Sequence, residues 1–353
     1  MGYVAPRWLP GPHVQTIWPA VIAPRLRRMQ TVAYRRERWT TPDNDFIDLD
    51  FACTARPSET ATATSPSAAP RLQDPDPRPL VVLFHGLEGS STSHYATAIC
   101  AQALQQGWRA VVPMFRGCSG EPNIAPRAYH SGDSNEIDWI LRRLHREHAS
   151  HAPLFAMGIS LGGNALAKWL GERAEQAAFI TAAATVCAPH DLQAGAKALA
   201  TGFNRVYTAS FMRTLKHKSL LKLQRYPGLF DRERMLAARD FFDFDDAVTA
   251  PMHGFSSCYD YWTRSSCRQF LGGIRVPTLI LNTLNDPFVP ASVLAGPEQV
   301  SRQVELDYPT QGGHVGFASS GFPGRFDFVP QRVLDFFGKQ LSMPAAKEET
   351  LDG

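Results

Sequence analysis

LFAMGISLGGNALAKWL, residues 154–170, places a serine flanked by glycines between two segments of different character. The first part, LFAMGI, is a short apolar run, typical of a strand that is buried on both faces of a parallel sheet. The second part, LGGNALAKWL, favours a helix. Gly158 and Gly162 lie two positions to either side of Ser160. The stretch therefore predicts a strand, a sharp turn that carries the serine, and a helix.

This arrangement is the context in which the pattern G-x-S-x-G carries chemistry. Small flanking residues allow the backbone to make a tight, strained turn, which exposes the Ser160 hydroxyl at the carboxyl end of the strand. The N-terminal amides of the following helix then point toward a reacting carbonyl. The alternative is a glycine-rich turn that contains a serine by chance. The context of strand, turn and helix favours the nucleophile.

Strands and helices alternate on both sides of this stretch, which predicts a mostly parallel sheet with helices on both faces. A leading antiparallel hairpin is expected from residues 31–41 and 46–53. A helix is expected to begin near Asp133, where Glu136 three positions later resembles a capping box. The other expected strands are 80–84, 109–115, 179–187, 276–282 and 304–308, and the other expected helices are 95–106 and 326–340.

The alternation stops between about residues 188 and 272, a region too long for an ordinary crossover and mostly helical in pattern. We interpret it as a helical cap inserted into an α/β-hydrolase fold, whose core comprises 1–187 and 273–342. Residues 57–79 are rich in Pro, Ala, Ser and Thr and predict a mobile loop. Residues 343–353 are expected to be a frayed tail.

A serine hydroxyl is a weak nucleophile at neutral pH and needs a base. His314 lies in a glycine-rich loop after the last expected strand, at the edge where such groups converge. The orienting acid should lie between the serine and the histidine in sequence. Asp286 fits, because it follows a buried strand, and Asp191 is a rival. We favour Asp286 on chain order and strand context, with His314 as general base.

The same chemistry needs two hydrogen-bond donors for an oxyanion. One is the backbone N–H of Leu161, the residue after the nucleophile. We assign the second to the N–H of Leu87, in the loop that follows the strand 80–84. His85 is expected to bond the loop backbone instead of acting as a base. The segments 116–121 and 129–133 either shape the pocket or brace the turn at Ser160.

Composition excludes several other classes of protein. The balance of 36 basic and 33 acidic residues is too mild for nucleic-acid binding. Six cysteines without a C-x-x-C pair suggest free thiols, and no metal or organic cofactor is expected. No apolar run is long enough to span a membrane, and no signal peptide is recognised, so a cytoplasmic protein is expected.

The expected cap contains a stretch in which basic residues alternate with large apolar ones. Two interpretations remain open: a solvated helix face, or a weak contact with a membrane surface or anionic lipid. The basic residues are Arg213, Lys216, His217, Lys218, Lys222 and Arg225.

Seven short motifs together resemble the YheT-like branch of the α/β-hydrolases. They span most of the chain, from His13 to about Phe317, but not residues 57–79. The motifs are GPHVQTIWP, HGLEGSS, RGCSGEPN, YHSGDSNE, GISLGGN, NDPFVP and GGHVGF.

The resemblance implies a triad of Ser160, Asp286 and His314, the same three residues that chain order favours. It also implies a small-molecule or lipid carboxyl ester as substrate. Hydrolysis through an acyl-enzyme is the expected reaction. Transfer of the acyl group to an alcohol, and an idle site on a binding protein, remain as alternatives.

Overall fold

The computed structural model describes residues 2–22, 32–54 and 76–342. Most of the predicted loop 57–79 and all of the predicted tail 343–353 lie outside these residues. Within them, no helix combines the length and the hydropathy that crossing a bilayer requires. All six cysteines are free thiols, as expected.

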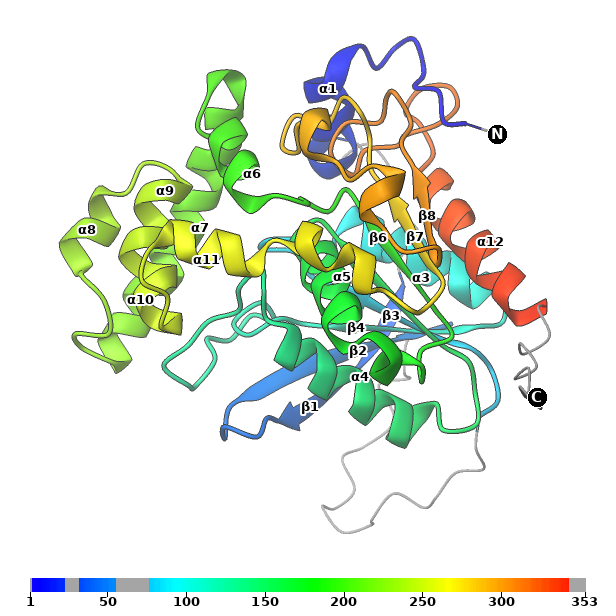
Figure 1. The fold of residues 1–353 in the computed structure, drawn as a ribbon, viewed down its shortest axis with the longest axis horizontal. Helices are drawn as coiled ribbons and strands as arrows, with labels where there is room; N and C mark the ends of the chain where they lie inside the picture. The colour runs from blue at the N-terminus through cyan, green and yellow to red at the C-terminus, as the bar shows by residue number, and fades with distance from the viewer. Residues whose placement is uncertain (1, 23–31, 55–75, 343–353) are drawn as a thin grey trace, which may run out of the picture.

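An eight-stranded sheet forms the centre of the molecule (Figure 1), in the order β1-β2-β4-β3-β5-β6-β7-β8. β1 and β2 form the expected antiparallel hairpin, and β2 also pairs antiparallel with β4. The remaining neighbours are parallel. The strands are β1 (Ala33–Thr40), β2 (Phe46–Cys53), β3 (Leu80–Phe84), β4 (Arg109–Pro113), β5 (Leu154–Ile159), β6 (Ala182–Val186), β7 (Thr278–Leu281) and β8 (Val304–Asp307).

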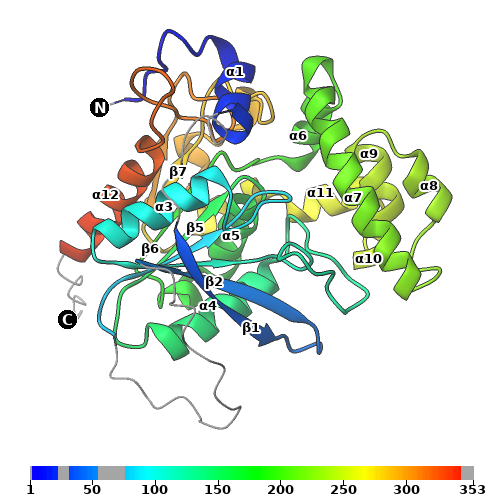
Figure 2. The same ribbon diagram turned by 180° about the vertical axis from the view of Figure 1, so that it is seen from behind.

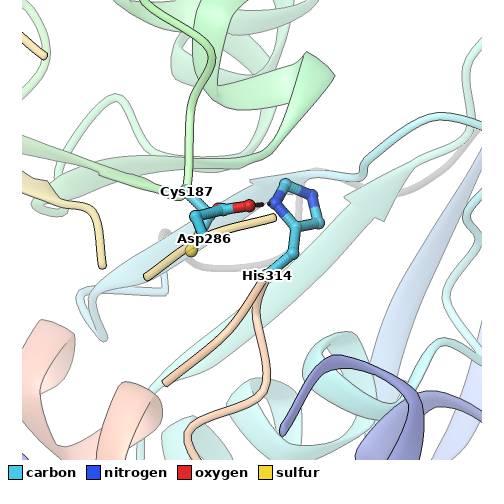
Figure 3. A group of neighbouring side chains, drawn as sticks. All are labelled: Cys187, Asp286 and His314. Atoms are coloured by element: carbon cyan, nitrogen blue, oxygen red, sulfur yellow. Dashed lines mark hydrogen bonds and ion pairs between the residues drawn. The ribbon is translucent and has the colours of Figure 1, made fainter. Parts of the chain in front are cut away.

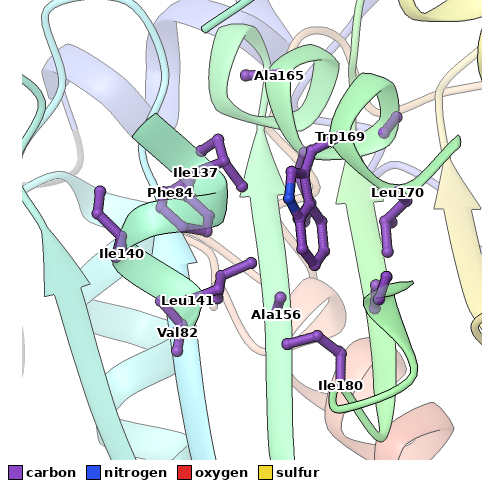
Figure 4. Packing of buried hydrophobic residues seen from close by; sticks show 14 of the residues in the cluster. Val82, Phe84, Ile137, Ile140, Leu141, Ala156, Ala165, Trp169, Leu170 and Ile180 are labelled. Atoms are coloured by element: carbon purple, nitrogen blue, oxygen red, sulfur yellow. The ribbon is translucent and has the colours of Figure 1, made fainter. Parts of the chain in front are cut away.

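Strand β3 shows why apolar runs form the centre of this sheet. Successive side chains of a strand point to opposite faces. Leu80, Val82 and Phe84 therefore pack into the cluster under α4 (Ser134–His148) and α5 (Leu161–Arg173), part of which Figure 4 shows. Val81 and Leu83 pack on the other face, under α3 (His94–Gln105) and α12 (Phe328–Ser342). Both faces of the sheet are thus covered by helices, as Figures 1 and 2 show from opposite sides.

The expected capping box at the start of α4 is wrong. Asp133 stands at the N-cap position, but its side chain makes no capping hydrogen bond. Instead it pairs with Arg127, and Glu136 pairs with Arg116 at 2.5 Å. In an ion pair with arginine both partners are charged, whereas in a capping bond only the carboxylate is, so tertiary contacts override the local motif.

Between β6 and β7 the chain forms a group of helices beside the sheet (Figure 1) instead of a single crossover helix. The helical content expected for residues 188–272 is therefore confirmed, whereas the division into core and cap stays a prediction. The helices are α6 (Leu192–Leu199), α7 (Arg205–Arg225), α8 (Arg232–Ala237), α9 (Phe241–Phe244), α10 (Ala250–His253) and α11 (Cys258–Ser265). Elsewhere lies α1 (Gly11–Ile17), and short helical turns occupy Trp18–Ile22, Ala174–Ala177, Gly202–Asn204, Asp245–Thr249, Cys267–Gly273, Ala291–Val293 and Pro297–Gln299.

Three basic side chains of α7 bond to other parts of the protein, which corrects their interpretation as a solvated face. Lys218 Nζ lies 2.8 Å from Glu88 Oε1, in the loop after β3. Lys222 Nζ donates to the carbonyl oxygens of Asn123 and Ala125. Lys216 Nζ donates to the carbonyl oxygen of Leu236. Lys218 and Lys222 thus connect α7 to the loops that follow β3 and β4.

Candidate active site

Ser160 occupies a strained turn between β5 and α5. Its φ of 50° and ψ of −117° lie in a region that non-glycine residues rarely adopt. A Cβ atom on Gly158 would lie 2.4 Å from the Gly162 carbonyl oxygen, and a Cβ on Gly162 would lie 2.5 Å from the carbonyl oxygens of Phe84 and His85. Only glycine fits at both positions, as the motif predicts.

The structure brings Ser160, His314 and Asp286 together from three different loops. His314 Nε2 lies 2.9 Å from Ser160 Oγ, and His314 Nδ1 lies 2.7 Å from Asp286 Oδ2 (Figure 3 shows the latter pair). Asp286 is 6% exposed, and its Oδ1 accepts the N–H groups of Phe288 and Val289. A carboxylate at Nδ1 keeps the proton there and leaves Nε2 free to accept the serine proton.

The rival acid Asp191 has a different place. Its side chain accepts the N–H of Ala194 at 3.0 Å and caps the N-terminus of α6. This is the ordinary role of an aspartate that precedes a helix. The structure thus places Asp286, and not Asp191, against His314.

The two predicted oxyanion donors are the N–H groups of Leu87, in the loop after β3, and of Leu161, directly after Ser160. The N–H groups of Gly86 and Glu88 donate to the hydroxyls of Tyr95 and Tyr129, at 3.0 and 2.9 Å. The N–H of Leu87, between them, forms no hydrogen bond with another described residue. Leu161 is the first residue of α5, where backbone N–H groups have no partner within the helix. Both residues line the same cavity as Ser160.

That cavity has a volume of about 950 Å³ and lies between the sheet edge and the helices that follow β6. On the sheet side it is lined by loops that follow the strands, including Ser160 and His314. On the helical side its lining is largely apolar, which suits an apolar ligand. The apolar residues there include Leu192, Leu199, Phe211, Phe241, Val248 and Met252.

Residues 79–319 match the model of a protein family whose description is "alpha/beta hydrolase fold". The chain belongs to the α/β-hydrolase family. It is 37% identical over 331 residues to "Putative esterase YheT" of Escherichia coli (strain K12), a match that covers 93% of this chain and 91% of that protein. It is 26% identical to human "Phospholipase ABHD3" over 92% of this chain and 78% of that protein.

Solved structures confirm the predicted fold. Est1E from Butyrivibrio proteoclasticus with bound ferulic acid superimposes with a TM-score of 0.52 at 15% identity, covering 87% of this chain and all of that one. At this identity the likeness concerns the fold alone. Together with the family match, it confirms the mostly parallel sheet with helices on both faces as that of an α/β-hydrolase.

The thiol of Cys187 lies close to His314 and Asp286 in this α/β-hydrolase. Cys187, Asp286 and His314 present one ligand atom each within 4.8 Å of one another, a spacing that a metal ion could use (Figure 3). The hydrogen bonds of these three side chains favour a role in holding the His314 loop instead. His314 Nδ1 and Asp286 already bond each other, the Cys187 sulfur accepts the N–H of Val315 at 3.3 Å, and burial raises the pKa of the Cys187 thiol.

His85 has the predicted structural role. Its Nε2 accepts the N–H of Phe115 at 3.1 Å, and its Nδ1 donates to the carbonyl oxygen of Gly86 at 2.8 Å. Burial lowers the pKa of His85 to about 4, which keeps the ring neutral in this role. It thereby holds the loop that carries Leu87 against the end of β4.

Asn164 is a bracing residue that the sequence analysis missed. It is fully buried and its amide donates to the carbonyl oxygens of Ser131 and Ser265, while its Oδ1 accepts the N–H of Cys267. The segment 129–133 therefore braces the turn at Ser160 and also lines the cavity, so both interpretations of it hold. A polar residue one turn into an apolar helix was the available signal.

A second buried histidine gives this α/β-hydrolase a predictable sensitivity to acid. His190 is 1% exposed, its Nδ1 accepts the N–H of Ala295 at 3.0 Å, and burial, with a smaller effect of Arg268, lowers its pKa to about 4. As the pH falls, the His190 imidazole takes up a proton near pH 6.5 in the unfolded chain, but only near pH 4 in the folded protein. The stability that His190 contributes is therefore complete above that pH and is lost as the pH falls toward 4.

At pH 5 this loss amounts to about 2 kcal/mol. His190→Asn keeps an acceptor at the Nδ1 position but does not titrate. We expect urea unfolding at pH 7 and pH 5 to show a larger fall in free energy for the wild type than for His190→Asn, by about that amount. Equal falls in the two proteins would show that His190 is not held neutral in the folded state.

Proposed function

We propose that this α/β-hydrolase is a serine hydrolase of carboxylic esters, with Ser160 as nucleophile, His314 as general base and Asp286 as the orienting acid. One observation carries the proposal. The imidazole of His314 lies within hydrogen-bond distance of both Ser160 Oγ and Asp286 Oδ2, at 2.9 and 2.7 Å. These contacts occur beside a cavity large enough for a small-molecule or lipid ester.

In the proposed reaction, Ser160 Oγ attacks the ester carbonyl while His314 Nε2 takes its proton. Asp286 stabilises the imidazolium that forms. The carbonyl oxygen becomes an oxyanion and receives the N–H groups of Leu87 and Leu161. His314 then gives its proton to the departing alcohol, and the acyl group stays on Ser160. Water, deprotonated by His314, attacks this acyl-enzyme, and His314 returns the proton to Ser160 Oγ as the acid is released.

The substrate class follows from the surroundings of Ser160. Of the two walls of the cavity, the one formed by α6, α7 and α9 is largely apolar. We therefore place the acyl chain against these helices, which act as the cap of the site. The relatives whose names describe an esterase and a phospholipase support ester substrates but give no chain length.

A fluorophosphonate probe tests the proposal directly, because it forms a covalent bond only with an activated serine. The Ser160 oxygen displaces fluoride from phosphorus, so we expect the wild type to gain the mass of one probe less HF, carried by the peptide that contains Ser160. The Ser160→Ala protein should gain none. A folded wild type that resists the probe and cleaves no ester would contradict the proposal and favour a binding protein with an idle site.

A further inference from the structure

Helix α1 contributes two side chains to the loop that carries His314. Thr16 Oγ1 accepts the N–H of His314 at 2.9 Å and donates to the carbonyl oxygen of Pro12 at 2.8 Å. Gln15 Oε1 accepts the N–H of Gly312 and an N–H of the Asn285 amide, both at 2.9 Å. Asn285 is the neighbour of Asp286, so Gln15 joins the loop of the base to the loop of the acid.

The loop needs support from outside because its backbone is strained. Val315 and Phe317 have φ values of 57° and 39°, which are costly for residues with a Cβ atom. Three successive N–H groups of the loop end on side chains from elsewhere. Gly312 donates to Gln15, Gly313 to Asn285 Oδ1 at 3.0 Å, and His314 to Thr16.

The contact between α1 and the loop is close and buried. A Cβ atom on Gly313 would lie 2.7 Å from Thr16 Oγ1, and one on Gly316 would lie 2.1 Å from the Gln15 carbonyl oxygen. Gln15 is 2% and Thr16 7% exposed. Figures 1 and 2 both show α1 against the orange segment that precedes α12. The backbones of α1 and of the loop thus approach each other closely at Gly313 and Gly316.

We propose that Gln15 and Thr16 are positioning residues, which hold the His314 imidazole between Ser160 and Asp286. The inference rests on the proposed function, since it concerns the same base. The role proposed for these two side chains needs no contact with the reacting atoms. Both act through the backbone N–H groups of residues 312–314. Both lie outside residues 79–319, which match the α/β-hydrolase family, but inside GPHVQTIWP, one of the motifs that resemble its YheT-like branch. The site is thus completed by a segment that precedes the matched part of the chain.

Thr16→Val tests the inference, because valine keeps the shape of threonine and removes its hydroxyl. We expect kcat to fall about 100-fold, as for a displacement of a catalytic group by about 1 Å. Thr16 lines the cavity, but valine keeps its shape there, so KM should change less than kcat. Thr16→Ser restores the acceptor and should recover most of kcat. Gln15→Leu, a second variant, should also lower kcat selectively.

The matched control is Thr97→Val in α3. Thr97 Oγ1 also donates to a carbonyl oxygen four residues earlier, that of Ser93, so the substitution removes the same kind of bond elsewhere. We expect it to leave kcat and KM near the wild-type values. Thermal unfolding of all the variants shows that each one is folded at the assay temperature.

A readout independent of turnover separates this inference from the proposed function. The proton between His314 Nδ1 and Asp286 should give a low-field NMR resonance, assigned by its loss in His314→Ala. We expect Thr16→Val to shift or broaden it and Thr16→Ser to restore it. An unchanged resonance and kcat in Thr16→Val would overturn the inference. A wild type without esterase activity would overturn the proposed function, and the resonances would still decide the positioning.

Discussion

Replacement of Ser160 by alanine is expected to lower kcat about 10⁶-fold, the loss found when another triad enzyme loses its nucleophile. Among the residues that the structure describes, His314 is the one hydrogen-bond partner of the Ser160 hydroxyl. Alanine adopts the φ of 50° at the same cost as serine, because both have one Cβ atom. We therefore expect the melting temperature to stay close to that of the wild type.

Steady-state hydrolysis of an activated ester measures the effect. Ser219→Ala is the matched control, because Ser219 is 6% exposed, lines the same cavity and belongs to α7. It should retain most of the activity. Undiminished turnover in a purified Ser160→Ala protein would disprove the role of Ser160.

The second large effect is expected at the acid. Asp286→Asn should lower kcat about 10⁴-fold, as the same change does in another Ser-His-Asp enzyme. The Asn side chain can still accept the N–H groups of Phe288 and Val289, which Asp286 Oδ1 now accepts. An amide N–H toward His314 would, however, hold the imidazole in the wrong tautomer. The fold should therefore survive while the base is lost.

Asp191→Asn is the control for this experiment. Asp191 caps α6 through the Ala194 N–H, and asparagine is an equally good N-cap. We expect kcat to change little in this variant. A larger loss of kcat in Asp191→Asn than in Asp286→Asn would show that Asp191, and not Asp286, is the orienting acid.

The sequence could predict the sheet and the three residues of the candidate triad because these depend on short patterns. Apolar runs such as 154–159 must be buried on both faces, and a serine between Gly158 and Gly162 fits only a sharp turn. The order of Ser160, Asp286 and His314 then follows from the strands that precede them. These features need no knowledge of distant contacts.

The errors arose where a distant partner decides what a side chain does. At the start of α4, Asp133 and Glu136 have the spacing of a capping box, but Arg127 and Arg116 bind them instead. On α7 the lysines looked like a solvated face, whereas Lys218 reaches Glu88 across 130 residues of sequence. No local pattern carries this information.

The contacts of α1 with the loop 312–316 also have a consequence for the order of assembly. Gln15 and Thr16 are translated almost 300 residues before the groups that they bind. Domains made on the ribosome begin to fold from the N-terminal side. The sheet up to β7 can therefore form while Gln15 and Thr16 still lack their partners. Contacts of such long sequence separation are also slow to close. In a newly made chain, competence for the reaction is thus acquired last, after the ribosome has released the segment that carries His314.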